Sequence, residues 1–367
     1  MESRHFLVRC DRLGEHCFVE LPRAPLPPGS VELRVDRFGL TANNATYGAL
    51  GESASYWRLF PSPHAGWGRI PVWGFGTVVR SELTELPVGE RFYGVFPMSS
   101  HVVVQPRRLD DQGFVDGAAH RRALSGVYNQ YLRTTRDPNY RADTEAVQAV
   151  LRPVFATSFF LPDYLQAHEW FGADAVVLSS ASSKLAYGMA FVLADARRAG
   201  REVIGLTSAP HAEFVRRLAL YDRVATYDDV AALPRTRRTV FIDIAGSPMV
   251  RAAVHHHLGE ALQHSLLVGL SHGVAATAAA DLPGPVPVAF FAPSWIEQRI
   301  RHWTPAGMQE RLAAAWHAFL MPVLDASRGW LTIASGEGSL AVARAYDDLL
   351  GGRGRPEIGH VLALGHA

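Results

Sequence analysis

The sequence predicts an α/β protein with two domains, one built on a doubly wound parallel sheet and the other made mostly of β-strands. Three observations support this fold class. Short apolar runs alternate with helical patterns from residue 175 to residue 270, which is typical of parallel strands joined by helices. Residues 1 to about 150 contain short strands separated by turns rich in proline and glycine. A chain of 367 residues also exceeds the size of one usual hydrophobic core.

The predicted parallel sheet is centred on the stretch 175–192. Residues 175–178 are apolar, which is typical of a short strand buried on both faces. A turn of small residues follows, and Leu185, Gly188 and Met189 then indicate a helix lying on the sheet. A strand, a tight turn and a helix form the first unit of a dinucleotide-binding fold. In that unit, phosphates bind backbone N–H groups at the positive end of the helix.

The turn after this strand lacks the glycine fingerprint G-x-G-x-x-G and carries serines at 179, 180, 182 and 183 instead. Serine adds hydroxyl donors to the backbone N–H groups, but it adopts positive φ less readily than glycine. Only Gly188, further into the helix, offers a close helix–strand contact. Two interpretations stay open: a nucleotide site, or a buried strand followed by a serine-capped helix without any ligand.

Further strands are predicted at 203–208, 224–226, 239–243 and 265–270, with helices between them. In doubly wound sheets, ligands bind at the carboxyl edge of the strands, where the strand order reverses. We therefore expect the residues that follow these strands to share one rim. They are residues 180–184, Thr207, Ser208, Tyr227, residues 243–246 and residues 271–273.

The first 150 residues predict a small barrel. Apolar and charged residues alternate over 31–38, and strands are predicted at 70–79, 92–96 and 102–104. Gly74 and Gly76 interrupt the second of these strands, which indicates a bulge or a close backbone approach. The pattern becomes helical over 118–151, and a separate apolar helix is expected at 155–171.

Residues 40–52 follow a predicted strand and carry several hydrogen-bonding side chains, which are Asn43, Asn44, Thr46 and Tyr47. Sites commonly form in such positions. An equally good interpretation is a turn in which asparagine side chains cap their own backbone. The last quarter predicts a helix at 306–319, a strand at 330–333, a helix at 340–350 and a closing strand at 359–364.

Composition excludes several classes of function. A formal net charge of +1 gives no electrostatic basis for binding nucleic acid or an acidic membrane surface. The sequence has no apolar run long enough to span a bilayer, and its first residues do not resemble a signal peptide, so we expect a cytoplasmic protein. Two cysteines, Cys10 and Cys17, and the consecutive histidines 255–257 do not have the spacing of metal ligands. We expect no metal.

The whole chain resembles the medium-chain dehydrogenase/reductase superfamily, on its zinc-free quinone and alkenal reductase side, and in particular a poorly characterised bacterial domain-of-unknown-function branch. The segments that carry the resemblance are LTANNATYGALG, PVWGFGTV, YNQYL with DPNY, SSASSKLAYG, FIDIAG and FFAPSWIEQR. The resemblance implies a GroES-like β-barrel catalytic domain formed by residues 1–150 and 321–367. It also implies a Rossmann dinucleotide-binding domain, residues 151–320, inserted between these two segments.

The resemblance also implies a cofactor, NADP(H), and residues that bind it. Serines 180, 182 and 183 stand where the superfamily has its glycine-rich turn. An acid that would bind the ribose of NAD is missing at Ser208, which favours a 2′-phosphate. Tyr227 matches a tyrosine that contacts the 2′-phosphate in related reductases, and Lys184 or Arg216 supplies positive charge. The full set of expected cofactor-binding residues is Ser180, Ser182, Ser183, Lys184, Ser208, Tyr227, Ala245, Gly246 and Ser271.

The activity implied by the resemblance is hydride transfer from NADPH to a small molecule with an activated C=C or carbonyl group. Without zinc, hydrogen bonds must stabilise the developing enolate. Tyr47 matches a tyrosine near the nicotinamide, and Tyr47, Asn44 and Tyr131 are the expected catalytic donors. A redox-neutral dehydratase, cyclase or lyase and a non-catalytic nucleotide-binding protein remain alternatives on the same fold. A homodimer is possible through the apolar stretch 275–291.

Overall fold

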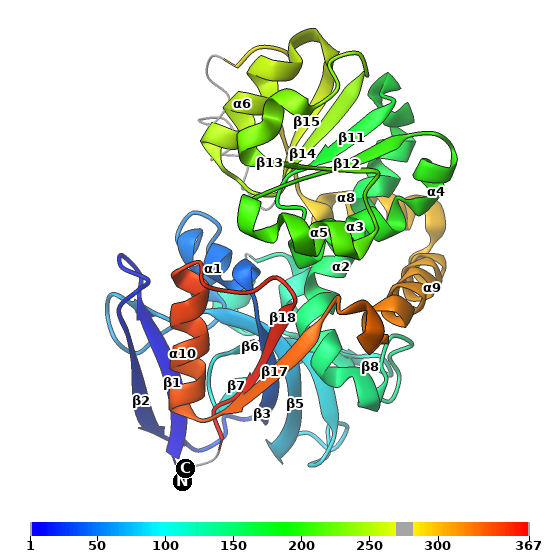
Figure 1. The fold of residues 1–367 in the computed structure, drawn as a ribbon. Helices are drawn as coiled ribbons and strands as arrows, with labels where there is room; N and C mark the ends of the chain where they lie inside the picture. The colour runs from blue at the N-terminus through cyan, green and yellow to red at the C-terminus, as the bar shows by residue number, and fades with distance from the viewer. Residues whose placement is uncertain (1, 123, 269–281, 366–367) are drawn as a thin grey trace. The chain divides into compact units, whose positions relative to one another are not determined.

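The computed structural model describes residues 2–122, 124–268 and 282–365, and the chain divides into two compact units (Figure 1). The first unit contains Met1–Pro153 and Thr332–Ala367, and the second contains Val154–Leu331. The sequence placed the boundaries at 150/151 and 320/321. At the second boundary, helix α9 (Pro305–Leu324) stays with the second unit, because its Trp316 and Phe319 pack on Phe155 of that unit.

The first unit consists of two sheets and few helices. A mixed sheet has the order β17-β18-β3-β5-β6-β10-β9-β8, with β7 also paired to β3, and a smaller sheet has the order β2-β1-β4. The strands are β1 (Glu2–Arg9), β2 (His16–Pro22), β3 (Val31–Leu40), β4 (Trp67–Gly68), β5 (Pro71–Ser81), β6 (Arg91–Pro97), β7 (His101–Val104), β8 (Pro106–Asp110), β9 (Gly113–Asp116), β10 (Gln130–Arg133), β17 (Thr332–Glu337) and β18 (Ile358–Ala363). The helices are α1 (Ala42–Ala49) and α10 (Ser339–Leu350).

The C-terminal segment completes the first unit. β17 and β18 are parallel and are joined by α10, whereas β18 pairs antiparallel with β3. Tyr346 of α10 is fully buried and contacts Phe6 of β1, with ring centroids 5.0 Å apart. This contact joins the C-terminal helix to the core formed by the first strands, as Figure 1 shows for α10 beside β1.

The second unit is a six-stranded parallel sheet with the order β13-β12-β11-β14-β15-β16, so the strand order reverses between β11 and β14. Apolar side chains of β11, β12 and β14 pack on Val254 and Leu258 of α6. The strands are β11 (Ala175–Leu178), β12 (Glu202–Thr207), β13 (Arg223–Thr226), β14 (Thr239–Asp243), β15 (Leu262–Val268) and β16 (Val288–Phe290). Besides α9 and most of α2 (Glu145–Ala167), the described residues of this unit form helices α3 (Lys184–Val192), α4 (Ala194–Arg198), α5 (Ala212–Leu218), α6 (Pro248–Leu258) and α8 (Ala292–Trp303).

This arrangement confirms the predicted fold class, including the doubly wound parallel sheet. The apolar stretch 275–291, expected to form a dimer edge, is only partly described, because residues 275–281 lie outside the described residues. Strand β16, which belongs to this stretch, pairs with β15 and is the last strand in the sheet order. Val288 of β16 is partly exposed. The homodimer stays a prediction.

The helical prediction for 118–171 is wrong in its boundaries. Residues 118–144 form short 3₁₀ turns and strand β10, and a single helix, α2 (Glu145–Ala167), then runs through Pro153 and Pro162. Proline has no N–H, so Pro153 cannot donate to the Ala149 carbonyl inside the helix. Gly39 of β3 lies against this carbonyl, and a Cβ at Gly39 would be 2.3 Å from the Ala149 oxygen. Glycine at 39 therefore allows α2 to pack closely where β3 leads into α1.

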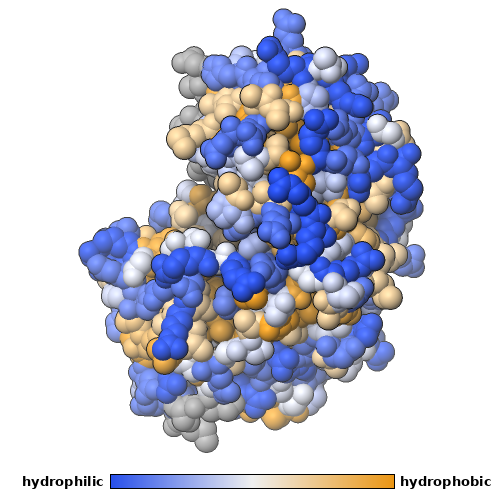
Figure 2. All heavy atoms as spheres, viewed as in Figure 1, coloured by the Kyte–Doolittle hydropathy of each residue, from blue (hydrophilic) through white to orange (hydrophobic). Residues whose placement is uncertain are grey.

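The glycines of β5 also allow close packing, as the sequence indicated. β3 has a register shift between Val35 and Arg37, opposite Gly76, and a Cβ at Gly74 would be 2.1 Å from the Arg37 oxygen. The surface is mixed in character, and Figure 2 shows hydrophilic residues and smaller apolar areas interspersed on the visible face. The most exposed large apolar residues are Met249, Met321, Val286, Val88 and Leu340.

Replacing Gly39 with alanine tests the close approach of β3 to α2. The added Cβ meets backbone atoms that cannot rotate away, so we expect Gly39→Ala to lower the free energy of unfolding by about 1–3 kcal/mol. Gly14→Ala is the matched control, because no atom lies within 4 Å of a Cβ there. Urea unfolding of both variants measures the difference. Equal stability of the two variants would contradict the prediction.

Candidate functional site

The serine turn, residues 179–183, lies where the parallel sheet reverses its order. β11 is paired with β12 on one side and with β14 on the other, so the carboxyl ends of these three strands are neighbours. Ligands bind doubly wound sheets at this position. The turn leads directly into α3, whose N-terminal N–H groups carry the positive end of the helix dipole.

The backbone of the serine turn is tight, although it contains no glycine. Ser180 has a φ of 51°, in the left-handed region that the sequence analysis considered less accessible to serine. Ala181 is fully buried, its N–H donates to the Leu206 carbonyl at 3.1 Å, and a Cβ at Gly205 would be 3.0 Å from its Cβ. The turn therefore lies directly against β12.

Ser183 is the N-cap of α3, and its hydroxyl accepts a hydrogen bond from the Ala186 N–H at 3.2 Å. The capping interpretation thus describes Ser183. Lys184 is the first residue of α3. Gly188 has a different role from the expected helix–strand contact, because a Cβ there would be 2.8 Å from Ser158 Oγ of α2. It allows two helices to approach each other.

A buried polar network fixes the two strand ends at the point of reversal. Asp243, the last residue of β14, is fully buried and pairs with the buried Arg251 of α6 at 2.8 Å. Ser179 Oγ donates to Asp243 Oδ1 at 3.0 Å and accepts from the N–H groups of Ile244 and Ala245 at 2.8 and 2.9 Å. Because Arg251 neutralises the carboxylate, an anionic ligand at this edge does not meet an unpaired negative charge.

Two further contacts join the serine turn to the ends of β12 and β13. The Ser180 N–H donates to Tyr227 Oη at 3.0 Å, and Tyr227 directly follows β13. Ser182 Oγ lies 3.1 Å from Nδ1 of His211, which belongs to the short 3₁₀ turn η6 (Ala209–His211) after β12. Burial raises the pKa of Tyr227. His211 has no recognisable role in the sequence alone, because its contact with Ser182 spans 29 residues.

The remaining predicted cofactor residues lie on the same edge where they are described. Ser208 is half-buried and is the N-cap residue of η6. Ala245 is exposed, and Gly246 has a φ of 66° with open space where a Cβ would be. The Gly246 N–H donates to Asp243 Oδ1 at 2.9 Å. Ser271 lies outside the described residues.

In the first unit, Tyr47 belongs to helix α1 and is part of an aromatic cluster that contains Tyr56, Tyr128 and Trp73. The Tyr47 ring lies 4.7 Å from the Tyr56 ring and 6.2 Å from the Tyr128 ring. Trp73 Nε1 donates to Tyr47 Oη at 3.2 Å, and the hydroxyls of Tyr56 and Tyr128 are 3.1 Å apart. Burial raises the pKa of Tyr47 to about 12, and the bond from Trp73 opposes this rise.

Tyr128 is the member of this cluster that sequence reasoning missed. It lies in the 3₁₀ turn η3 (Gly126–Asn129), and burial raises its pKa well above the ordinary value. Its only sequence signal was its place in the YNQYL segment, from which Tyr131 was taken as the candidate donor. Within the aromatic cluster, Tyr128 brings a second hydroxyl close to Tyr47 and Tyr56.

Asn44 and Tyr131 need correction as catalytic donors. Asn44 Oδ1 accepts from the Thr41 N–H at 2.7 Å in a capping box, and its Nδ2 donates to the Pro71 carbonyl at 2.9 Å. Tyr131 is fully buried in the core of the first unit, stacked on Phe114, and its hydroxyl donates to the Val95 carbonyl at 2.6 Å. The hydrogen bonds of both side chains serve the fold, as the capping interpretation predicted for the asparagine.

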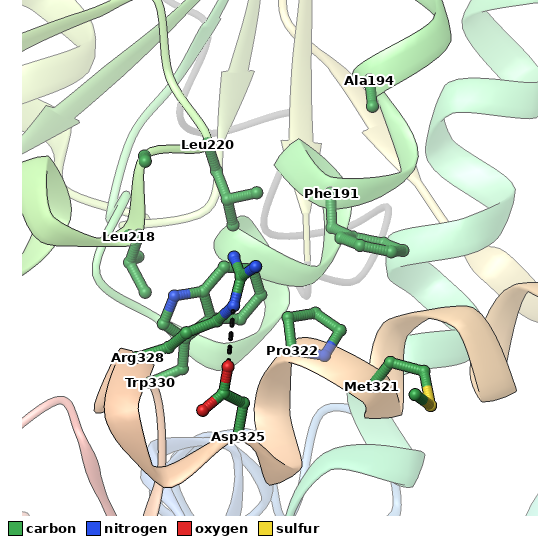
Figure 3. Close-up of a pocket in the computed structure, with 10 residues that line it drawn as sticks. Phe191, Ala194, Leu218, Leu220, Met321, Pro322, Asp325, Arg328 and Trp330 are labelled. Carbon is green, nitrogen blue, oxygen red and sulfur yellow. Dashed lines mark hydrogen bonds and ion pairs between the residues drawn. The ribbon is translucent and has the colours of Figure 1, made fainter.

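A separate pocket of about 490 Å³ lies in the second unit (Figure 3). Phe191, Leu220 and Trp330 contribute apolar walls, and Arg328 bonds Asp325 at 3.4 Å beside them. Its lining residues come from the end of α3, the start of α4, the residues at the end of α5 and the segment 321–330. None of the predicted site residues lines it.

Two searches of the described residues bear on other functions. Over residues 2–122, 124–268 and 282–365, no group of three or more His, Cys, Asp or Glu side chains is placed to hold a metal ion. Among the helices of the same residues, none has the length and apolar character needed to cross a membrane.

Comparison with known proteins gives one family match and many similar folds. A family model described as "Protein of unknown function (DUF2855)" matches residues 38–355. A search of curated proteins finds no significant match. Solved structures with a similar fold cover 99% of this chain.

Three of these structures illustrate the likeness. CurA from Vibrio vulnificus in complex with NADPH has a TM-score of 0.61 at 14% identity and is covered over 100% of its length. A Bacillus thuringiensis protein proposed to be an NADPH:quinone reductase has a TM-score of 0.56 at 14% identity and is covered over 99%. The Etr1p complex with NADP and crotonyl-CoA has a TM-score of 0.53 at 10% identity and is covered over 100%. At these identities the likeness shows the fold, which is the two-domain fold of the medium-chain dehydrogenase/reductase superfamily.

The buried network at the strand reversal can be tested by removing its cation. Arg251→Ala leaves the Asp243 carboxylate buried without its partner, so we expect the free energy of unfolding to fall by about 3–5 kcal/mol. Arg328→Ala is the control, because it removes one member of an exposed pair, which contributes about 0–1 kcal/mol. Chemical denaturation measures both. A loss below about 1 kcal/mol for Arg251→Ala would contradict the prediction.

Proposed function

The chain belongs to the DUF2855 family, described as proteins of unknown function, and we propose that it is an NADP(H)-dependent oxidoreductase acting on a small molecule. We further propose that the reaction is hydride transfer to an activated C=C or carbonyl group. The observation that carries this proposal is the serine turn at the reversal of a β13-β12-β11-β14-β15-β16 sheet, ahead of the N-terminus of α3. The NADPH and NADP complexes among the structures of similar fold support it.

The residues of the turn fit a dinucleotide. Ser180 and Ser182 are small, Ala181 is withdrawn into the contact with β12, and the N-terminus of α3 follows directly. The open space beside Gly246 leaves room on the neighbouring strand end. Serine hydroxyls and backbone N–H groups are donors suited to a diphosphate. In this proposal Ser180, Ser182, Ser183 and Lys184 hold the diphosphate, and Ala245 and Gly246 line the adjacent edge.

The same edge favours the 2′-phosphorylated cofactor. Ser208 occupies the position where a carboxylate would bind the ribose of NAD and repel a 2′-phosphate. The Tyr227 hydroxyl lies at the same edge of the sheet, because it accepts a hydrogen bond from the serine turn. We propose that Ser208 and Tyr227 donate to the 2′-phosphate.

When bound, the cofactor supplies the hydride, and Tyr47 is the proposed donor to the oxygen on which negative charge develops. Trp73 Nε1 already donates to Tyr47 Oη, so the Tyr47 proton is left to point toward another acceptor. Burial raises the pKa of Tyr47 and so keeps the phenol protonated and able to donate a hydrogen bond, and the bond from Trp73 limits this rise. No metal takes part in the proposed reaction.

A redox-neutral reaction on the same fold is the second candidate. The observation that favours it is the bond between the Ser180 N–H and Tyr227, because one donor of the turn is already used within the protein. NADPH oxidation measured with a panel of enones, quinones and aldehydes distinguishes the two. Turnover of a substrate without a change in NADPH absorbance would support the second candidate.

Cofactor choice tests the assignment of Ser208. We expect the wild-type protein to bind NADPH more tightly than NADH, and Ser208→Asp to reverse this order, because a carboxylate repels the 2′-phosphate and accepts from a ribose hydroxyl. The expected change is about 1.5–3 kcal/mol, the size of a charge-assisted hydrogen bond. Fluorescence titration with both nucleotides measures it. Ala253→Asp places the same charge on the exposed face of α6 as a control, and wild-type preference for NADH would refute the assignment.

Turnover tests the role of Tyr47. Tyr47→Phe keeps the ring in the aromatic cluster and removes only the hydroxyl, so we expect folding to survive and kcat to fall by about 100-fold or more. The NADPH dissociation constant should stay unchanged, since the phenol acts on the substrate. Tyr164→Phe, in α2 of the second unit, is the matched control. Wild-type kcat in the Tyr47→Phe variant would remove the tyrosine from the mechanism.

A further inference from the structure

His211 lies at the end of β12 and contacts the serine turn. Its Nδ1 is 3.1 Å from Ser182 Oγ, and its backbone N–H donates to the Ser208 carbonyl at 3.0 Å. Ser182 is buried, whereas His211 is half-buried. The ring thus bridges the end of β12, where the ribose of a dinucleotide lies in this fold, and the turn proposed to hold the diphosphate.

The contact with Ser182 determines how the ring can act. One nitrogen is engaged by the serine hydroxyl, so the other nitrogen, Nε2, is directed away from the turn. A neutral imidazole has one donor and one acceptor, and a protonated imidazole has two donors and a positive charge. A neutral ring that accepts from the Ser182 hydroxyl at Nδ1 can also donate through Nε2, but only the protonated ring adds a positive charge to that donor.

Both signs of charge occur on the elements around His211. Lys184 begins α3, and Glu213 and Arg216 belong to α5. Asp228 and Asp229 belong to the 3₁₀ turn η7 (Tyr227–Ala232), and Asp229 accepts from Thr226 Oγ1 at 3.1 Å. Within residues 208–211 themselves the sequence is Ser-Ala-Pro-His, with no carboxylate. His211 is therefore the one titratable group of the β12 end itself.

We propose that His211, in its protonated form, binds the 2′-phosphate of the cofactor, so that the preference for NADP(H) over NAD(H) depends on pH. This inference rests on the proposed function, since it assigns a recognition group within the same nucleotide site. The partner is a phosphate monoester, a dianion at neutral pH. Ser182 holds the ring in place through Nδ1, and Nε2 donates to the phosphate.

The direction of the pH dependence follows from linkage. A bound dianion favours the protonated imidazole, so binding takes up a proton and becomes tighter as the pH falls through the range where histidine titrates. This gain in affinity is fully present at the lower end of that pH range and is lost as the pH rises. Below about pH 6 the phosphate itself becomes protonated, which sets the lower limit of the useful window.

Calorimetric titration of the full chain with 2′,5′-ADP and with 5′-AMP separates the 2′-phosphate from the rest of the nucleotide, because the two differ only in that group. Between about pH 8 and pH 6.5, we expect the ratio of the two affinities to rise about tenfold in the wild-type protein, as a charge-assisted hydrogen bond implies. Repeating the titration in buffers of different ionisation enthalpy should show proton uptake for 2′,5′-ADP that exceeds any uptake for 5′-AMP.

His211→Gln keeps a hydrogen-bonding side chain but cannot become charged, so the affinity ratio should become independent of pH and proton uptake should vanish. His256→Gln changes an exposed histidine of α6 and should behave as wild type. His211→Asn also cannot become charged and provides a second variant if His211→Gln does not fold, with the same expected loss of pH dependence.

The outcomes separate this inference from the proposed function. Binding of both nucleotides with a pH-independent ratio, or with the same pH dependence in His211→Gln, would overturn the role of His211 and leave the cofactor site standing. Binding of neither nucleotide at any pH would overturn the cofactor site, and the role of His211 with it.

Discussion

The buried pairing of Asp243 with Arg251 is the constraint on which the carboxyl edge of the parallel sheet depends. The carboxylate also receives Ser179 Oγ and the Gly246 N–H, so one side chain holds the ends of β11 and β14 together at the point where the sheet reverses. Ser179 Oγ then fixes two backbone N–H groups after β14. A buried ion pair of this kind contributes more to fixing the local geometry than to the net stability of the fold. Here it fixes the place at which the serine turn begins.

Much of the fold was predictable because it depends on local patterns. The apolar runs of β11, β12 and β14 are buried on both faces, and this burial explains why their sequences are almost entirely apolar. Helix α2 was not predictable, because Pro153 normally ends a helix. The carbonyl of Ala149, which proline leaves without a helical donor, packs against Gly39, more than a hundred residues earlier in the chain. No local sequence pattern contains that contact.

The candidate site was also only partly predictable from the sequence, because its contacts join distant segments. Asn44 and Tyr131 looked like free donors in the sequence, but their partners, the carbonyls of Pro71 and Val95, are 27 and 36 residues away. The Ser182–His211 and Tyr227–Ser180 contacts also join distant segments. Sequence reasoning placed polar residues at this edge, because they follow each strand, whereas Tyr47 was proposed from the resemblance and stays a prediction. Which side chains are already satisfied within the protein is a tertiary property.

The left-handed conformation of Ser180 has a consequence for the thermodynamics of ligand binding. The turn is held in this conformation by its own contacts with β12 and Tyr227, so a ligand would meet a loop that is already ordered, and little conformational entropy would be lost. A phosphate oxygen that accepts from the Ser180 N–H must replace the Tyr227 oxygen. The released phenol can then donate to the 2′-phosphate, as proposed above, so one hydrogen bond within the protein is exchanged for two hydrogen bonds to the ligand.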